Sequence, residues 1–250
     1  MPYAISSSLR PGCRAKTIRP SRSRRTPLPS SISGTLCPVR LLAVPLAVLS
    51  LQAYHATAQP LSPSIRHEVA SHGLWHSGCP VSLSGLRVLT VSYWDFAGAP
   101  QTGQLIVRAR AAPKLARVFH RLYQLHFPIR HMQLDDTYGP QSAWPADGDV
   151  TASFECRQAV PSPCTGGTGT GHWSEHAYGE AVDLNPNENP YVGCGMTRDK
   201  TALRYVKRTP LRPGMVTPAV IAAFASVGWG WGGSWSGSTK DYMHFSATGH

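Results

Sequence analysis

The chain has 250 residues, enough for one sizeable domain, and a formal net charge of +11. Eight of its 24 Lys and Arg residues lie in residues 1–58, which contain no Asp or Glu, so the remainder holds 16 basic and 13 acidic residues and carries only +3. The total charge therefore gives no support for a nucleic-acid-binding protein, and we expect no nucleic-acid partner.

Residues 1–58 are predicted to be an export signal with a long basic n-region. The apolar run LLAVPLAVLSLQA at 41–53 has about the length of a signal h-region, and A-T-A at 56–58 is an A-x-A cleavage motif. The run is short and contains Pro45, so no stable membrane span is expected after processing. Ordinary secretion is favoured. The alternatives are a twin-arginine route, suggested by the paired arginines in SRRTPL, and an uncleaved or lipidated anchor.

The folded domain is expected at 76–250, after a polar linker at 59–75. Its first element is a β-hairpin, because LRVLTVSYWDF at 86–96 and GQLIVRARAA at 103–112 are rich in β-branched and apolar residues and are joined by turn residues. Apolar residues and arginines alternate in the second strand. This pattern predicts a half-buried strand with one apolar face and a second face that ends in Arg108 and Arg110.

Two helices and a later strand complete the predicted elements. Residues 113–127 place apolar side chains three and four apart after Pro113, which suits a first helical turn. Residues 180–186 are predicted to be a strand that proline ends. Residues 217–229 are predicted to be a second helix, capped by Thr217. Without a regular βαβ rhythm, this mixture predicts an α+β fold with a central, mostly antiparallel sheet flanked by helices.

Four cysteines remain once the predicted signal is removed: Cys79, Cys156, Cys164 and Cys194. An even number in an exported protein indicates disulfides, for which three pairings exist. The local pair Cys156–Cys164 is favoured, with four separate thiols as the alternative. No C-x-x-C spacing occurs, so a zinc site made of cysteines is not expected.

Four side chains suggest metal-assisted hydrolysis: His176, Asp183, Asp241 and His244. Two histidines and one carboxylate are a common catalytic zinc set, and a further carboxylate beside it can move the proton of an attacking water. A turn between His176 and Asp183 is needed, because two side chains seven residues apart in a regular helix or strand cannot both contact one small ligand. Isolated His and Asp residues are more often structural, so spacing alone does not decide the case.

The motif SEHAYGEAVD at 174–183 resembles the S-x-H-x-x-G-x-A-x-D motif of the zinc D-alanyl-D-alanine carboxypeptidases, which include L-alanyl-D-glutamate endopeptidases. The sequence DYMHF resembles their closing motif, and TASFECR resembles a segment that ends in a substrate-facing arginine. DLNPNENPYV and GWGWGGSW resemble the same branch. The resemblance covers roughly residues 78–245. It implies a fold similar to these peptidases and to the hedgehog signalling domain.

Carried onto this chain, the resemblance implies a zinc ion bound by His176, Asp183 and His244. Asp241 would be the general base, where many relatives use the longer glutamate. Arg157 would donate to the oxygen that becomes negative during the reaction, the alternative being a surface salt bridge.

Five further residues of these segments are assigned. Ser174 is expected beside the metal ligands, with a local backbone hydrogen bond as the alternative. Trp231 and Trp235 are candidates for a substrate groove, with core packing as the alternative. Glu175 and Glu180 are expected to point outward.

These observations together predict an exported zinc peptidase that hydrolyses peptidoglycan stem peptides, in the periplasm or at the cell wall, as a monomer. A D-alanyl-D-alanine carboxypeptidase is the first expectation. The alternatives are an L-alanyl-D-glutamate endopeptidase and a non-catalytic, zinc-containing binding module like the hedgehog domain. A carboxypeptidase needs a cation for the terminal carboxylate, and the candidates after the motif are Arg198, Lys200, Arg204 and Arg212.

Overall fold

The structure is a computed structural model that describes residues 53–250. The expected n-region and nearly all of the h-region lie outside the described residues. No helix between residues 53 and 250 has the length and apolar character that crossing a membrane requires. The described chain mixes helices with small antiparallel sheets, which confirms the α+β class.

A three-stranded antiparallel sheet of order β1-β2-β3 forms the first half of the fold. The predicted hairpin is confirmed: β2 (Leu86–Trp94) pairs along its whole length with β3 (Pro100–Arg108). The edge strand β1 (Ala56–Pro60) pairs with β2 on the other side. The cleavage site expected after Ala58 therefore falls inside a paired strand.

The prediction of a linker at 59–75 is wrong, because this range contains the end of β1 and a helix. The helix α1 (Pro63–Ser71) begins at the cap Ser62, whose hydroxyl accepts a hydrogen bond from the amide of Ile65. Val69 of this helix is fully buried. The polar composition of this segment did not predict the helix, because only a few apolar residues pack it against the core.

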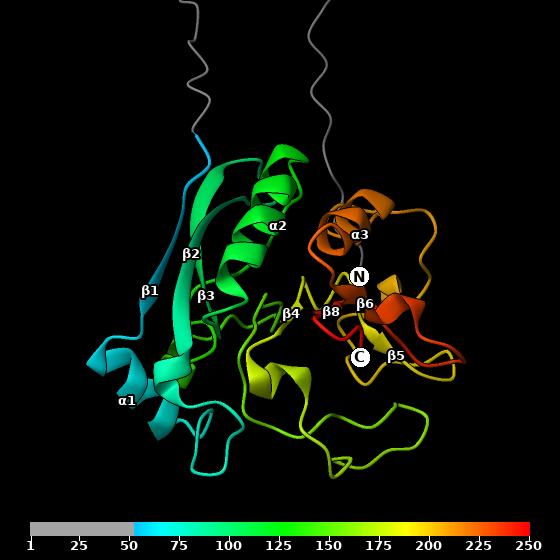
Figure 1. Ribbon diagram of the computed structural model, residues 1–250. Coiled ribbons are helices and arrows are strands. Elements are labelled where there is room, and N and C mark those ends of the chain that lie inside the picture. The colour runs from blue at the N-terminus through cyan, green and yellow to red at the C-terminus, as the bar shows by residue number, and fades with distance from the viewer. Residues whose placement is uncertain (1–52) are drawn as a thin grey trace, which may run out of the picture. The chain divides into compact units, whose positions relative to one another are not determined.

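The predicted helix at 113–127 is observed as α2 (Ala112–Gln124). Its apolar stripe packs on the sheet and joins the main core, which also contains residues of β4, α3 and β8 (Val182, Phe224 and Phe245). Figure 1 shows α2 lying along the sheet on the side that faces α3. One core therefore lies beneath both halves of the domain.

The second half contains two small antiparallel sheets rather than an extension of the first. The strands β4 (Ala181–Asp183), β8 (His244–Ser246) and β6 (Gly230–Trp231) form one sheet, in the order β4-β8-β6. The strands β5 (Tyr191–Val192) and β7 (Lys240–Asp241) form the other. The expected single central sheet is thus replaced by three small ones, and similarity to the hedgehog fold stays a prediction.

The predicted second helix is observed as α3 (Pro218–Ala225), shorter than the predicted range. Thr217 caps it as expected, accepting from the amide of Val220 at 3.4 Å. Phe224 of this helix stacks on Phe245 of β8, with ring centroids 3.8 Å apart. This contact fixes β8, and with it His244, against the core.

The prediction of a half-buried strand is wrong for the middle of β3, which is buried on both faces. Ile106 is fully buried beneath Phe154 and Tyr138 in a second core cluster. Tyr138 also donates a hydrogen bond to the carbonyl of Phe154 at 2.7 Å. The segment that precedes the active-site motif therefore covers the face of the sheet opposite α2.

The disulfides are Cys79–Cys156 and Cys164–Cys194, so the local pair expected from sequence is wrong. Cys156 is buried in the second core cluster, whereas Cys164 lies in an exposed loop. Short separation along the chain therefore did not decide the pairing. The first bridge ends next to Arg157, and the second ties the loop after Arg157 to residue 194.

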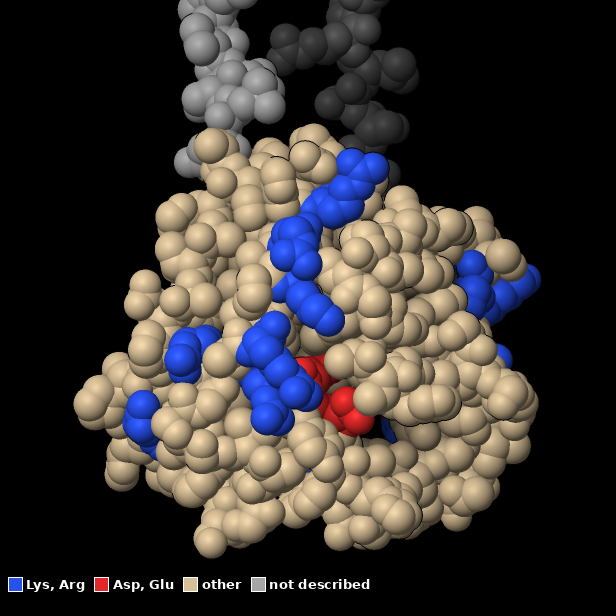
Figure 2. All heavy atoms as spheres, viewed as in Figure 1, with Lys and Arg blue, Asp and Glu red and all other residues tan. Residues whose placement is uncertain are grey.

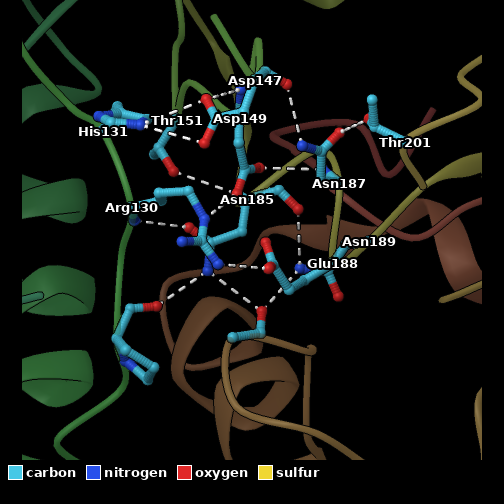
Figure 3. Close-up of polar contacts among 12 residues, drawn as sticks. Arg130, His131, Asp147, Asp149, Thr151, Asn185, Asn187, Glu188, Asn189 and Thr201 are labelled. Carbon is cyan, nitrogen blue, oxygen red and sulfur yellow. Dashed lines mark hydrogen bonds and ion pairs between the residues drawn. The ribbon is translucent and has the colours of Figure 1, made fainter. Parts of the chain in front are cut away.

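A buried polar network fixes the segment that follows β4. Figure 3 shows Arg130 between two buried carboxylates: its Nε donates to Asp149 at 2.7 Å, and an η nitrogen donates to Glu188 at 2.8 Å. The side chain of Asn185 accepts from the amide of Arg130 and donates to the carbonyl of Pro128. This segment is thereby clamped to the chain just after α2, which holds the end of β4 in place.

Candidate active site

Three side chains from two separate segments of the chain, His176, Asp183 and His244, converge at the end of β4. The Nδ1 atom of His244 lies 3.1 Å from both the Nε2 atom of His176 and the Oδ1 atom of Asp183. The Nε2 atom of His176 lies 3.2 Å from the Oδ2 atom of Asp183. His176 and His244 are buried, and Asp183 is half-buried. The set predicted from the motif is therefore brought together as one cluster.

The motif achieves this by a sharp turn rather than a continuous strand. His176 lies on the short 3-10 helix η3 (Glu175–Tyr178), which Ser174 caps by accepting from the amide of His176 at 3.3 Å. Gly179 ends η3 with φ of 65°, and a Cβ there would lie 2.7 Å from the backbone nitrogen of Arg108. Glycine is required at this point, because both the left-handed backbone and the close approach of β3 exclude a side chain.

Strand pairing supplies the remaining two groups. Asp183 ends β4 and is the direct partner of His244, the first residue of β8. Asp241 lies in β7, which is paired with β5 through Tyr191. A two-residue bend between β7 and β8 allows Asp241 and His244 to line the same cleft.

Backbone carbonyls orient both imidazoles. Nδ1 of His176 donates to the carbonyl of Ser153 at 2.5 Å, which leaves Nε2 directed at the cluster. Nε2 of His244 lies 3.2 Å from the carbonyl of His250, which leaves Nδ1 directed at the cluster. Such outer hydrogen bonds fix the tautomer and orientation of metal-binding histidines.

Electrostatic effects shift the pKa values of Asp183 and Asp241 in opposite directions. Burial alone would raise the pKa of Asp183, but hydrogen bonds and charge from His176 and His244 hold it well below its usual range. Burial, reinforced by the negative charge of Asp183, raises the pKa of Asp241 to about 7. Its Oδ1 atom is buried and has no hydrogen-bond partner among the described residues. One carboxylate is thus held ionised, and the other is suited to accept a proton.

Arg157 lies in the same cleft on the segment that runs beside the motif. Its carbonyl accepts from the amide of Ser174, and its Nε donates to Glu155 at 2.7 Å. Burial lowers the pKa of Arg157, but Glu155, Asp183 and Asp241 outweigh this effect and raise it. Arg157 therefore forms a salt bridge and also lines the cleft, although the two were expected as alternatives. Glu155 orients the guanidinium.

The cleft has a volume of about 350 Å³. Trp235 lines it together with Trp173 and Tyr191. Trp231 does not line it: its ring packs against Phe245 and its Nε1 donates to the carbonyl of Tyr242, so its place fits the packing alternative.

Two glutamates of the motif are not directed outward, contrary to expectation. Glu175 lines the cleft, and Glu180 is buried and paired with Arg110. The prediction assumed strand-like alternation, but η3 rotates residue 175 toward the cleft. The change from the 3-10 helix to strand β4 at Gly179 breaks this alternation.

The three converging groups fit a zinc ion. Nitrogen and carboxylate oxygen are normal zinc ligands, and bonds of roughly 2.0–2.1 Å at tetrahedral angles separate neighbouring ligand atoms by about 3.3 Å. The observed separations of 3.1–3.2 Å are close to that value. A second group, His76 with Cys79 and Cys156, is a weaker candidate because its cysteines form a disulfide.

Comparison with known families supports a peptidase. A family model described as D-alanyl-D-alanine carboxypeptidase matches residues 168–247, which confirms the resemblance over this segment. The match contains His176, Asp183, Asp241 and His244, but not Arg157. No curated protein and no solved structure matches the chain.

Proposed function

We propose that the protein is an exported zinc peptidase that hydrolyses peptidoglycan stem peptides, with His176, Asp183 and His244 as zinc ligands. The observation that carries the proposal is the unpartnered, buried Oδ1 atom of Asp241 in the cleft of the three ligands. A purely structural metal site needs no such acceptor. The description of the matched family supports the proposed substrate class.

The proposed mechanism uses two residues around the metal. Bound zinc would lower the pKa of a water molecule and polarise the peptide carbonyl. Asp241 takes the proton of the attacking water and passes it to the leaving amine. Arg157 donates to the carbonyl oxygen as negative charge develops on it, and Glu155 holds its guanidinium in place. Ser174 acts indirectly, by capping the turn that presents His176.

The family description favours D-alanyl-D-alanine carboxypeptidase activity. The distribution of charge supports a second candidate, the L-alanyl-D-glutamate endopeptidase. Arg157 is the one Lys or Arg among the described residues that line the cleft, and the four cations after the motif do not line it. A carboxypeptidase would need Arg157 both for the terminal carboxylate and for the developing oxyanion, whereas an endopeptidase needs it for the oxyanion alone.

Location and assembly are part of the same proposal. A wall substrate requires export, and two disulfides suit an oxidising compartment such as the periplasm or the cell exterior. Trp235 would contact the peptide from one wall of the cleft. We propose that the protein acts as a monomer.

Mass spectrometry of a defined muramyl-pentapeptide, incubated with the zinc-loaded protein, tests the proposal. Loss of the terminal alanine would establish the carboxypeptidase, and a cut between L-alanine and the D-glutamyl residue would establish the endopeptidase. Zinc binding with both peptide bonds intact would refute hydrolysis of this substrate class and favour the non-catalytic module.

A further inference from the structure

A line of basic side chains follows the exposed side of α2 toward the cleft. Residues 96–134 contain six Lys or Arg residues and no Asp or Glu. Figure 2 shows Lys and Arg in a line over α2 that ends beside acidic side chains at a hollow in this face. We define this basic stripe as Arg108, Arg110, Lys114, Arg117 and Arg121. The small net charge of the domain hides this uneven distribution.

The helical part of the stripe has no counter-charge. Lys114, Arg117 and Arg121 are exposed, three and four residues apart on one side of α2. None of them forms an ion pair with another described residue, and Arg121 donates only to the neutral side chain of Gln124. Like charges at this spacing weaken a helix. An anion lying along α2 would remove that repulsion.

The lower end of the stripe is joined to the active-site motif. The Nε atom of Arg110 donates to Glu180 at 2.6 Å. Glu180 lies between η3, which carries His176, and β4, which ends in Asp183. A chain bound along the stripe would therefore lie beside the entrance of the cleft.

We propose that the basic stripe binds a linear, phosphodiester-linked polyanion of the cell envelope and so holds the cleft next to its substrate. This inference rests on the proposed function. A single line of cations matches a chain with repeating charges, and guanidinium groups match phosphate geometry. A membrane fits less well, because the apolar side of α2 is buried in the core and none of the exposed large apolar side chains belongs to α2.

Isothermal titration of the processed protein with synthetic poly(glycerol phosphate), at about 50 and about 200 mM salt, tests the proposal. The stripe variant combines Lys114→Gln, Arg117→Gln and Arg121→Gln. A matched control removes three exposed charges elsewhere: Lys200→Gln, Arg204→Gln and Lys207→Gln. Thermal unfolding checks that both variants are folded.

The stripe variant should bind roughly tenfold or more weakly at the lower salt concentration, with a smaller salt dependence, because it has lost up to three phosphate contacts. The control should bind like the wild type. Equal weakening in both variants, or tighter wild-type binding to phosphatidylglycerol vesicles or random-sequence duplex DNA, would overturn the proposal. Hydrolysis is measured separately on a soluble muropeptide, so an inactive protein that binds the polymer refutes the proposed function and leaves the stripe standing.

Discussion

Asp183 and His244 are direct partners across the β4–β8 pair, 61 residues apart in the chain. The carboxylate and the imidazole therefore project from adjacent strands toward His176. Phe224 stacks on Phe245, the residue that follows His244, so the geometry of the proposed ligands depends on the same contacts as the core. We therefore expect a substitution of one of these ligands to be detected as a loss of bound metal.

Replacing His176 with alanine should abolish stoichiometric zinc binding, because it removes one of three protein ligands. Metal content after dialysis, measured by mass spectrometry, checks this. The matched control is His172→Ala, an exposed histidine four residues away that should leave the zinc content unchanged. Equal zinc in both variants would show that the cluster is not the binding site.

Asp241→Asn should lower kcat by roughly 10²–10⁴-fold with zinc still bound, because the amide cannot accept the proton of the attacking water. Asp241→Glu should retain more activity than Asp241→Asn. Hydrolysis rates and zinc content are measured on the same samples, with Asp199→Asn as an exposed control. Full activity of Asp241→Asn would refute its role as the base.

Arg157→Ala should reduce kcat by roughly 10²–10³-fold, as expected when a donor to the developing oxyanion is lost. Glu155→Gln should reduce kcat less, since it releases the guanidinium without removing it. Steady-state kinetics on a soluble muropeptide distinguish the two. If Arg157→Ala raises KM and leaves kcat unchanged, the arginine binds the substrate uniformly and does not favour the transition state.

The buried carboxylates around Arg130 predict a pH-dependent stability. Burial, with Glu188 adding to it, raises the pKa of Asp149 from 3.8 to about 7. Between these values the folded protein binds more protons at this site than the unfolded chain, so the free energy of unfolding falls as pH rises. Urea unfolding at about pH 5 and about pH 7.5 should show this fall, and Asp149→Asn should reduce it. Asp135→Asn is the exposed control; a fall that Asp149→Asn leaves unchanged would assign the effect to other groups.

The two disulfides make distinct predictions. Peptide mapping without reduction should recover Cys79 linked to Cys156, which closes a separation of 77 residues, and should recover no Cys156–Cys164 peptide. Replacing both Cys79 and Cys156 with serine should lower the free energy of unfolding by about 2–5 kcal/mol. It should also reduce kcat, because Cys156 precedes Arg157.

The sequence predicted the elements that depend on local patterns. The hairpin and both later helices followed from alternation, 3–4 spacing and caps such as Thr217. The four groups of the motif followed from resemblance. What it missed depends on contacts between distant segments: the burial of Ile106, the pairing of Cys79 with Cys156, and the ion pair of Glu180 with Arg110. The polar composition of 59–75 also failed to predict α1. Its few apolar residues are enough to hold the helix in place, because Val69 is fully buried.

The backbone contacts of the two imidazoles predict how the protein would bind the proposed metal. Ser153 and His250 hold the rings through main-chain carbonyls, and strand pairing holds Asp183. All of these restraints are contacts within the chain, so we expect the proposed ligands to be arranged before an ion binds. Zinc binding should therefore proceed without a folding transition, unlike in zinc fingers. A chelator should abolish hydrolytic activity and leave the circular dichroism spectrum unchanged.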